Sequence, residues 1–299
     1  MTDLSKPGVA TALVEQIKSD IDQYCIEAYD TGHRKHLGAS QIGKECKRQI
    51  WYEFRWCFTN LFDKDGNTPE ENQANYGRMM RLFQRGHFEE PRFVERLRGI
   101  GAEVWEHDEN GDQFRVSAVE GHFGGSLDGV ARLPERYGVD KPVLVEFKTM
   151  STKAFPKLVK NGVAVEKPVY YAQFSVYGYF YDFDYVLFMV VDKNDDSLHI
   201  ELCKINKPLG KQMVLKAEQI ITSQEPPPRI SDDPTFWNCK MCPAYKVCFQ
   251  NAPVEKNCRA CKFGKPAANK SWFCTFHEKT IPDEVIPVGC DQYEPIVNG

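Results

Sequence analysis

The sequence lacks any apolar run that approaches the length of a membrane-spanning helix, which is about eighteen residues. Its longest candidate, at residues 185–191, is only as long as a strand. The first residues, MTDLSKPGVATALVEQ, also lack the basic and then apolar pattern of a signal peptide. No long low-complexity segment is present. We therefore expect a folded globular protein of the cytoplasm that makes no membrane contact.

The phosphate-binding loop GxxxxGK[ST] is absent too, which excludes a helicase motor of that kind from these 299 residues. A net charge of −4 does not by itself indicate a nucleic-acid-binding protein, although a net charge near zero can conceal a local basic face. Cysteine, by contrast, is plentiful, with eleven residues. A cytoplasm keeps thiols reduced, which argues against a disulfide framework. Seven cysteines and one histidine lie between Cys239 and Cys290, and this crowding predicts metal ligation.

The most informative stretch is residues 121–149, GHFGGSLDGVARLPERYGVDKPVLVEFKT. It places Asp128 at the end of one predicted strand and Glu146 and Lys148 on the next. Residues two apart on a strand point to the same face, so Glu146 and Lys148 project together while their neighbours pack the other way. Two carboxylates and an ammonium near one point suit a divalent cation and phosphodiester hydrolysis. An Asp-Gly hairpin beside an exposed Glu-x-Lys pair would explain the same residues.

Helical spacing predicts an amphipathic helix at residues 9–30 and another at residues 78–102. One apolar stripe of the second helix is expected to face inward. Its members are Phe83, His87, Glu90, Val94 and Leu97. An inward polar group is costly without a partner, so either a hydrogen bond or a metal ion must meet His87.

Basic and aromatic residues alternate in LGASQIGKECKRQIWYEFRW, where Ser40 is the predicted helix cap. Such residues can contact a phosphate backbone and stack on bases, or the aromatics can be core and the charges a solvated face. The lysines of a predicted short helix at residues 151–161 allow the same two interpretations, contact with phosphates or a solvated face. The candidate DNA contacts are Lys47, Arg48, Trp51, Arg55, Lys153 and Lys157. A helix opened by Pro168 carries Gln173 and Tyr177 on one face, where they can orient a substrate or a lysine.

Two groups of cysteines follow the Pro-rich boundary at residues 225–229. Cys239, Cys242 and Cys248 supply three thiolates, one fewer than a structural zinc ion or an iron–sulfur cluster usually takes. Downstream, a C-x2-C pair and a C-x2-H pair twelve residues apart resemble a zinc ribbon or knuckle. The candidate zinc ligands are Cys258, Cys261, Cys274, His277 and Cys290. Spacing leaves open whether His277 or Cys290 is the fourth ligand.

In this order, His87, Asp128, Glu146-x-Lys148 and Gln173-x3-Tyr177 resemble the RecB-type branch of the PD-(D/E)XK nucleases. The resemblance covers residues 38–250. It implies an α/β, restriction-endonuclease-like fold with a mixed central sheet flanked by helices. In the CRISPR-associated and AddB-like members a split cysteine set binds a four-iron cluster that joins the ends of the domain. The matching positions are Cys46, Cys239, Cys242 and Cys248.

The resemblance also implies a role for each motif residue. His87, Asp128, Glu146 and the carbonyl of Phe147 would hold Mg2+ or Mn2+. Lys148 would position the water or help to activate it. The residues then expected to be catalytic are Asp128, Glu146, Lys148, Gln173 and Tyr177, the last two supporting the lysine and the DNA. Glu89 or Glu90 would reach a second ion.

We therefore expect an N-terminal helical segment at residues 1–37, a nuclease domain at 38–250 and a small C-terminal zinc module at 251–299. The implied function is metal-dependent DNA hydrolysis, exonucleolytic on single-stranded or end-processed DNA, in recombination, repair or replication. A phage-encoded enzyme in the host cytoplasm fits best. Expected partners are DNA and a helicase, recombinase or single-strand-binding protein. The rival functions are a structure-specific or restriction-type endonuclease and a non-catalytic DNA-binding or assembly protein.

Overall fold

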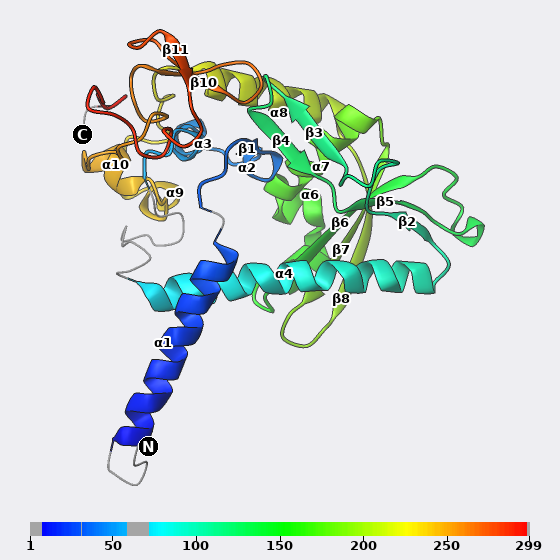
Figure 1. Cartoon of the computed structure of the whole chain (residues 1–299). Coiled ribbons are helices and arrows are strands. Elements are labelled where there is room, and N and C mark those ends of the chain that lie inside the picture. Colours follow the sequence, from blue (N-terminus) through cyan, green and yellow to red (C-terminus); the bar gives the residue numbers. More distant parts are fainter. Residues whose placement is uncertain (1–7, 31, 59–71, 298–299) are drawn as a thin grey trace.

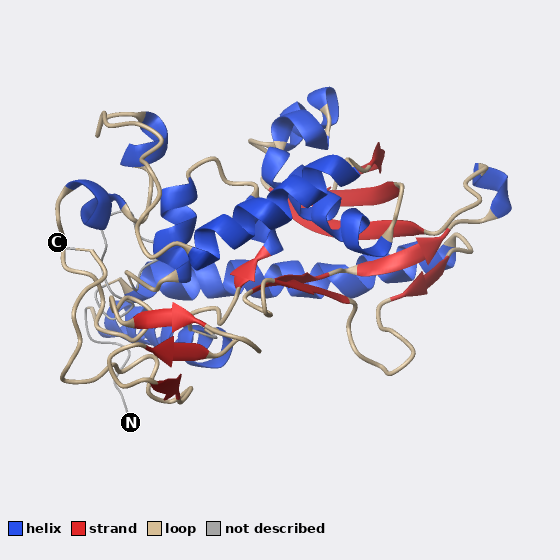
Figure 2. Ribbon diagram, turned by 90° about the horizontal axis from the view of Figure 1, so that it is seen from above, coloured by secondary structure: helices blue, strands red, loops and turns tan. Residues whose placement is uncertain are grey.

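The computed structural model describes residues 8–30, 32–58 and 72–297. Its centre is a five-stranded mixed sheet in the order β2-β5-β6-β7-β8 (Figures 1 and 2). The strands are β2 (Glu103–Trp105), β5 (Gly129–Arg132), β6 (Val143–Met150), β7 (Tyr185–Asp192) and β8 (Leu198–Lys204). Strands β6 and β7 are parallel, and the other neighbours are antiparallel. The mixed α/β sheet expected from the sequence is confirmed.

Helices cover both faces of this sheet. Helix α4 (Gln73–Gly99) packs on one face, and α7 (Pro168–Tyr181) with α8 (Lys207–Thr222) lies on the other. The connection from β6 to β7 also contains α5 (Phe155–Asn161) and α6 (Val163–Glu166). Two separate apolar clusters result, one beneath α4 and one beneath α7.

The side chains of β6 alternate between these clusters. Val145 and Phe147 join the cluster under α4, where the Phe147 ring stacks on Phe93 with centroids 5.0 Å apart. Leu144 and Met150 join the cluster on the α7 side. Since side chains alternate along a strand, Glu146 and Lys148 must point toward α7. The alternation expected from the sequence is confirmed.

A second, three-stranded sheet lies beside the first, in the order β1-β4-β3. Its strands are β1 (Leu37–Gly38), β3 (Arg115–Ala118) and β4 (Phe123–Ser126). β1 runs parallel to β4, with Leu37 beside Phe123. The chain passes from β4 through Leu127 and Asp128 directly into β5, so this small sheet fixes where Asp128 enters the central one.

The helix expected to begin at Ser40 is instead two helices, α2 (Ala39–Ile42) and α3 (Lys47–Phe54). Cys46 caps α3, its Sγ accepting a hydrogen bond from the backbone N–H of Gln49. In the segment between α2 and α3, the chain lies close to α7. A Cβ on Gly43 would lie only 2.6 Å from the Cα of Val169. This contact leaves no room for a side chain at that position.

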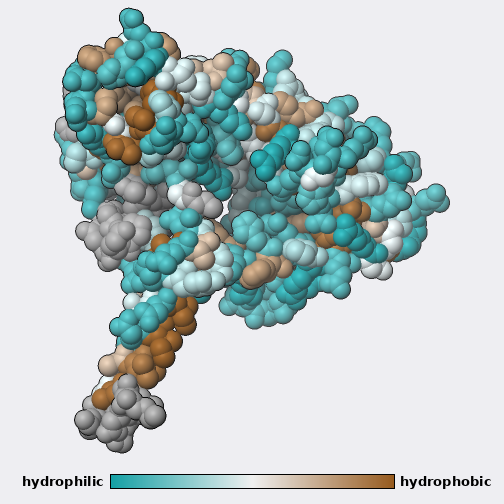
Figure 3. Space-filling model, in the orientation of Figure 1, coloured by the Kyte–Doolittle hydropathy of each residue, from teal (hydrophilic) through white to brown (hydrophobic). Residues whose placement is uncertain are grey.

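Helix α1 (Val9–Tyr29) projects from the body, and its C-terminal part contacts α4 (Figure 1). Its buried residues are Asp22, which forms an ion pair with Arg81, and Cys25. The helix predicted here is confirmed, but its apolar stripe faces away from α4 and is exposed (Figure 3). The exposed members are Leu13, Val14, Ile17, Ile21 and Tyr24.

The C-terminal segment shares a core with the preceding domain. The elements after α8 are α9 (Trp237–Lys240), α10 (Tyr245–Phe249), β9 (Gly264–Pro266), β10 (Trp272–Cys274) and β11 (Lys279–Ile281). A short 3-10 helix, η1 (Glu135–Tyr137), lies between β5 and β6. Strands β9 to β11 form an antiparallel sheet. Trp272 is 1% exposed and packs on Phe54 of α3, with ring centroids 5.6 Å apart.

Two residues expected to contact DNA lie inside this shared core. Trp51 and Arg55 are both fully buried. The Trp51 indole donates to the carbonyl of Ser223, and the Arg55 guanidinium donates to the carbonyl of Gly264 at 2.8 Å. Neither has a free face on which a base could stack, because both are fully buried. They are structural residues of the core.

In the described part of the chain, no helix combines the length and the apolar composition that crossing a membrane requires.

The shared core predicts that Trp272→Ala destabilises the whole protein. Replacing a buried tryptophan by alanine typically costs about 3–5 kcal/mol. The matched control is Trp237→Ala, since Trp237 is 69% exposed, and surface changes stay within about 0.5 kcal/mol. Urea unfolding followed by circular dichroism measures both. Equal effects of the two substitutions would show that the C-terminal segment does not contribute to the core.

Candidate active site

Three charged side chains meet where β5 and β6 pair. Asp128 accepts a hydrogen bond from the backbone N–H of Phe147 through Oδ2, at 2.7 Å. The Lys148 ammonium forms an ion pair with Glu146 and lies 3.9 Å from Asp128 Oδ2. It also donates to the carbonyl oxygen of Phe147 at 2.9 Å. The structure therefore brings together the residues that the sequence placed at one point.

Glu146 is the most unusual member, because its side chain is 0% exposed. Burial raises the pKa of its carboxyl to about 7; the Lys148 ammonium opposes this shift, and the carboxylates of Asp128 and Glu90 add to it. One oxygen, Oε2, has no hydrogen-bond partner among the described residues. A buried carboxylate oxygen without a partner is costly unless something else satisfies it.

Lys148 remains an ammonium. Burial disfavours its charged form, but the carboxylates of Glu146 and Asp128 outweigh burial and raise its pKa above the ordinary value. The site thus joins one permanent cation to a carboxyl group that changes charge near neutral pH.

Helix α7 covers the site from above. Gln173 and Tyr177 lie one turn apart, and the Gln173 amide donates to the Tyr177 hydroxyl at 3.1 Å. Both are buried, and burial raises the pKa of Tyr177, which stays a neutral hydroxyl. The ring of Tyr170 lies closer to the cleft, with the Lys148 ammonium 5.7 Å from its centroid. Sequence reasoning missed Tyr170, although it is three residues before Gln173 and so shares its face of the helix.

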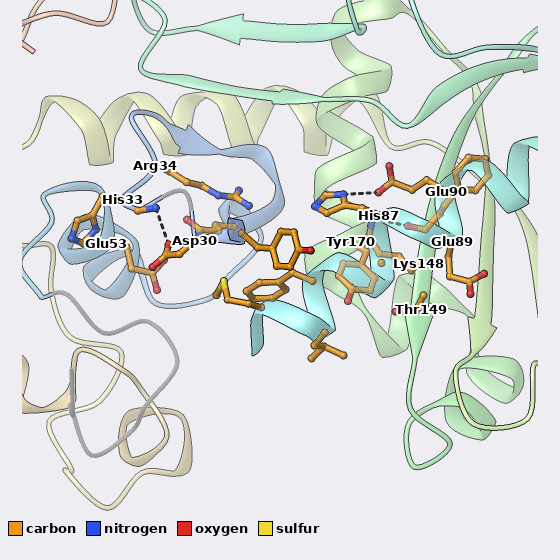
Figure 4. Close-up of a pocket in the computed structure, with 18 of the residues that line it drawn as sticks. Asp30, His33, Arg34, Glu53, His87, Glu89, Glu90, Lys148, Thr149 and Tyr170 are labelled. Carbon is orange, nitrogen blue, oxygen red and sulfur yellow. Dashed lines mark hydrogen bonds and ion pairs between the residues drawn. The ribbon is translucent and has the colours of Figure 1, made fainter. Parts of the chain in front are cut away.

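Helix α4 forms the opposite wall (Figure 4). His87 Nδ1 lies 3.4 Å from Glu90 Oε1. His87 was expected to face inward, but its side chain is 77% exposed, because this part of α4 borders an open cleft rather than the apolar core. Burial and the charge of Asp128 raise the pKa of Glu90, which places its carboxyl near the acidic pair. Glu89 is buried instead and pairs with Arg92 at 2.6 Å.

A cleft of about 760 Å³ extends from this site toward the segment that joins α1 to β1. At the near end it is lined by His87, Glu90, Phe147, Lys148, Thr149 and Tyr170. At the far end it is lined by Asp30, His33, Arg34 and Glu53 (Figure 4). His36, two residues after Arg34, also lines the cleft. Sequence reasoning missed the far end, although the run HRKH at residues 33–36 is a basic signal.

The side chains as they stand do not form a ready-made metal cage. In the described ranges, no three histidine, cysteine, aspartate or glutamate side chains are grouped so that they could hold an ion. At the acidic pair, the Lys148 ammonium itself lies against Glu146. The donor chemistry nevertheless fits a hard cation such as Mg2+ or Mn2+, which prefers carboxylate and carbonyl oxygens. Two carboxylate oxygens near the cleft lack a hydrogen-bond partner among the described residues, Glu146 Oε2 and Glu89 Oε2 of α4.

Two further cavities are lined by cysteines that the sequence separates, although in the described residues neither set is grouped closely enough to hold an ion as it stands. A cavity of about 350 Å³ is lined by Cys46, Cys239, Cys242 and Cys248. A much smaller one, of about 20 Å³, is lined by Cys258, Cys261, Cys274, His277 and Cys290. All of these cysteines are free thiols. Cys290 Sγ lies 3.7 Å from His277 Nε2. Burial, with the neighbouring thiols, raises the pKa of Cys258 to about 11.

The other predicted DNA contacts lie away from the cleft. Arg48 donates to the Tyr52 hydroxyl and borders the larger cysteine cavity, and Lys47 donates to Gln219 of α8. Lys153 and Lys157 are exposed but do not line the cleft.

No family model matches the chain, and no curated protein matches it significantly. Solved structures similar to it include SSO0001, with 15% identity and a TM-score of 0.41 over 79% of this chain and 98% of that chain. An alkaline exonuclease from Laribacter hongkongensis, LHK-Exo, has 16% identity and a TM-score of 0.39 over 66% of this chain and 90% of its own. The structure of LHK-Exo in complex with dAMP has the same identity and TM-score, over 62% of this chain and 86% of that chain. Scores this low do not establish a shared fold, so function must come from the site.

The electrostatics of the site predict how the Glu146 pKa responds to its neighbours in metal-free protein. Asp128→Asn removes a charge that raises this pKa and should lower it. Lys148→Met removes the charge that lowers it and should raise it. Each shift should be on the order of one unit. Carboxyl 13C NMR titration in EDTA, assigned with Glu146→Gln, measures the value, and Asp140→Asn is the exposed control.

The raised pKa of Glu146 makes the stability of the protein depend on pH. The folded-state pKa of about 7 lies above the ordinary 4.5, so Glu146 contributes stability below about pH 4.5 that is lost as the pH rises through about 7. A Glu146 carboxyl that titrates near its ordinary value would contradict the burial on which this depends.

Proposed function

We propose that this protein is a divalent-metal-dependent DNA nuclease. The observation that carries the proposal is Glu146, a fully buried carboxyl with an unpartnered oxygen, held beside Asp128 and Lys148 at the inner end of a cleft. A scaffold gains nothing from this arrangement, because buried ionic groups are usually no more stable than apolar residues of the same volume. A site for phosphodiester hydrolysis needs such carboxylates and a cation beside them.

Asp128, Glu146 and the Phe147 carbonyl would hold Mg2+ or Mn2+, with Glu90 and His87 as the ligands nearest to them from α4. When bound, the ion supplies Lewis-acid stabilisation of the transition state and lowers the pKa of its water. Lys148 contributes a permanent positive charge. Because its pKa is raised, it acts by orienting water or a phosphate oxygen and not as a general base.

Gln173 and Tyr177 act indirectly. Both are buried side chains of α7, so neither would touch a DNA strand. Their hydrogen bond closes the apolar side of the site, and the Tyr177 hydroxyl stays near Glu146 and Lys148. Tyr170, which lies over the ammonium at the cleft wall, is the aromatic residue in position to meet a base or sugar.

We propose a single DNA strand as the substrate and exonuclease as the mode. The cleft of about 760 Å³ is in the range of pockets for small ligands, about 300–1,000 Å³, which suits one strand better than a duplex. An endonuclease with the same metal site remains the rival mode, and closed circles distinguish the two.

The two cysteine cavities complete the proposal. Cys46 comes from the start of the domain and the other three cysteines from its end, so a four-iron cluster there would tie the two ends together. The second set, with Cys258, Cys261, Cys274 and either His277 or Cys290, would bind a structural zinc ion.

The catalytic proposal predicts that Lys148→Ala and Asp128→Asn each reduce DNA hydrolysis at least about 100-fold, as is usual when a charge that stabilises the transition state is removed. Lys279→Ala, an exposed control on β11, should keep full activity. The assay uses linear and circular single- and double-stranded DNA with Mg2+ or Mn2+.

Equal cleavage by the wild type and the two site variants would refute the proposed active site. Degradation of linear but not circular single strands identifies an exonuclease, and cleavage of circles would refute that mode alone.

The cluster proposal predicts that protein purified without oxygen is brown, with thiolate-to-iron absorbance at about 400 nm. Cys46→Ala should lose the colour and the iron. Cys203→Ala, which removes a buried thiol of the β-sheet core, should keep both. Metal analysis checks the result, and a colourless anaerobic preparation with zinc in both cavities would reject the cluster.

A further inference from the structure

A group of positive charges surrounds His36 at the far end of the cleft. His36 and Arg34 line the cleft itself. Burial lowers the pKa of His36, and the positive charges of Lys270, Arg34, Arg115 and Arg259 lower it further. Two carboxylates also line this part of the cleft (Figure 4), and both have other partners: Asp30 accepts a hydrogen bond from the backbone N–H of Gly32 at 2.8 Å, and Glu53 forms an ion pair with Lys44 at 2.8 Å.

The small sheet explains how these residues come together. β1 and β4 run in parallel with Leu37 beside Phe123, so His36 and His122 precede them side by side. The backbone N–H of Leu37 donates to the carbonyl of His122 at 2.8 Å. On the other side of β4, strand β3 contributes Arg115, which pairs with Ser126. A Cβ on Gly124 of β4 would lie 2.7 Å from the Val116 carbonyl oxygen of β3 and 3.9 Å from His36 Cδ2, so the His36 ring lies against the β3–β4 hairpin, next to the residue that follows Arg115. Three segments therefore meet here: β1, this hairpin and a loop of the C-terminal part.

The third segment is the loop at residues 267–271 of the cysteine-rich C-terminal part. The N–H of Lys270 donates to the carbonyl of Glu120 at 2.8 Å, and His122 Nε2 lies 2.8 Å from the carbonyl oxygen of Ala267. Lys270 adopts a left-handed conformation, with φ of 60°. Such a conformation is uncommon for a long side chain and is held here by the contacts on both sides of it.

The stem of Lys270 is fixed as well. It crosses directly over Gly121, where a Cβ would lie only 2.6 Å from Lys270 Cγ. Gly121 itself has φ of 82°, which favours glycine. The lysine is exposed, yet its backbone and the root of its side chain are both set by the turn at residues 119–121. The C-terminal segment therefore delivers a positioned charge, unlike a lysine on a free loop.

We propose that Arg34, His36, Arg115 and Lys270 form a subsite for a phosphate of the DNA strand, and that the cysteine-rich C-terminal segment is thereby part of the substrate-binding surface. This inference rests on the proposed function, because the strand would run from Lys148 along the cleft to this subsite. The phosphate is either an internal phosphodiester or a terminal phosphate, since both present the same anionic oxygens.

The salt dependence of DNA binding tests the subsite. Each phosphate contact on a single strand contributes about 0.7 to the slope of log K against log salt concentration. In the Lys148→Ala background with EDTA, Lys270→Ala should weaken binding of a short labelled oligothymidylate and reduce that slope by about 0.7. Lys270→Arg should retain both. Lys265→Ala, an exposed lysine of the same segment, should change neither.

An unchanged slope in Lys270→Ala, or an equal loss in Lys265→Ala, would overturn the subsite. Oligothymidylates with and without a terminal phosphate show which phosphate the subsite binds. If Lys270→Ala weakens binding only of the phosphorylated oligonucleotide, the subsite binds the terminal phosphate. If it weakens binding of both, the subsite binds an internal phosphodiester. Matching urea unfolding curves exclude a folding defect.

The nuclease assay separates this inference from the proposed function. If Lys148→Ala cleaves normally while Lys270→Ala still lowers the slope, the subsite stands and the proposed active site fails. If Lys148→Ala abolishes cleavage while Lys270→Ala leaves the slope unchanged, the reverse holds.

Discussion

The structure depends on one costly arrangement, a carboxyl group buried completely in the middle of the central sheet. Glu146 is the only acid of β6 among residues that otherwise pack into two apolar clusters. Its charge is tolerable only because the Lys148 ammonium lies against it, since the Asp128 carboxylate and the burial under α7 both disfavour the charged form. Each of these partners belongs to a different part of the fold. The sheet register, the crossover through α7 and the entry of β5 from the small sheet must all be correct for the group to be buried.

The parts of the site that sequence predicts well are those fixed by local periodicity. Two-residue spacing on β6 determines that Glu146 and Lys148 share a face, whatever packs above them. Four-residue spacing on α7 determines that Gln173 and Tyr177 meet. Asp128 required one further assumption, that the strand it precedes pairs with β6, the next strand along the chain after residues 133–142. These predictions hold because they need little information about distant residues.

Other predictions failed where a distant segment decides what is covered. The aromatic and basic pattern of α3 is compatible with a DNA-binding face, but both Trp51 and Arg55 are buried. Trp51 donates to the carbonyl of Ser223 after α8, and Arg55 packs against the C-terminal segment at Gly264 and Trp272. Helical spacing on α4 identified a stripe, but the cleft exposes His87 and buries Glu89 instead. Helix α1 shows the opposite case, an apolar stripe with no covering element among the described residues. Amphipathicity locates a face and leaves its partner undetermined.

The C-terminal segment joins the stability of the protein to its cleft. Arg259 is fully buried, and its guanidinium lies 4.3 to 4.7 Å from the ring centroids of Phe54, Trp56 and Trp272. Two of its nitrogens lack a hydrogen-bond partner in the described structure, so the aromatic faces must offset much of its burial. The same segment places Lys270 over Gly121, in the turn that leads into His122 beside His36. Deleting it would expose this core, and a loss of DNA binding in such a truncation would report unfolding. Only substitutions on its exposed surface can separate the two roles.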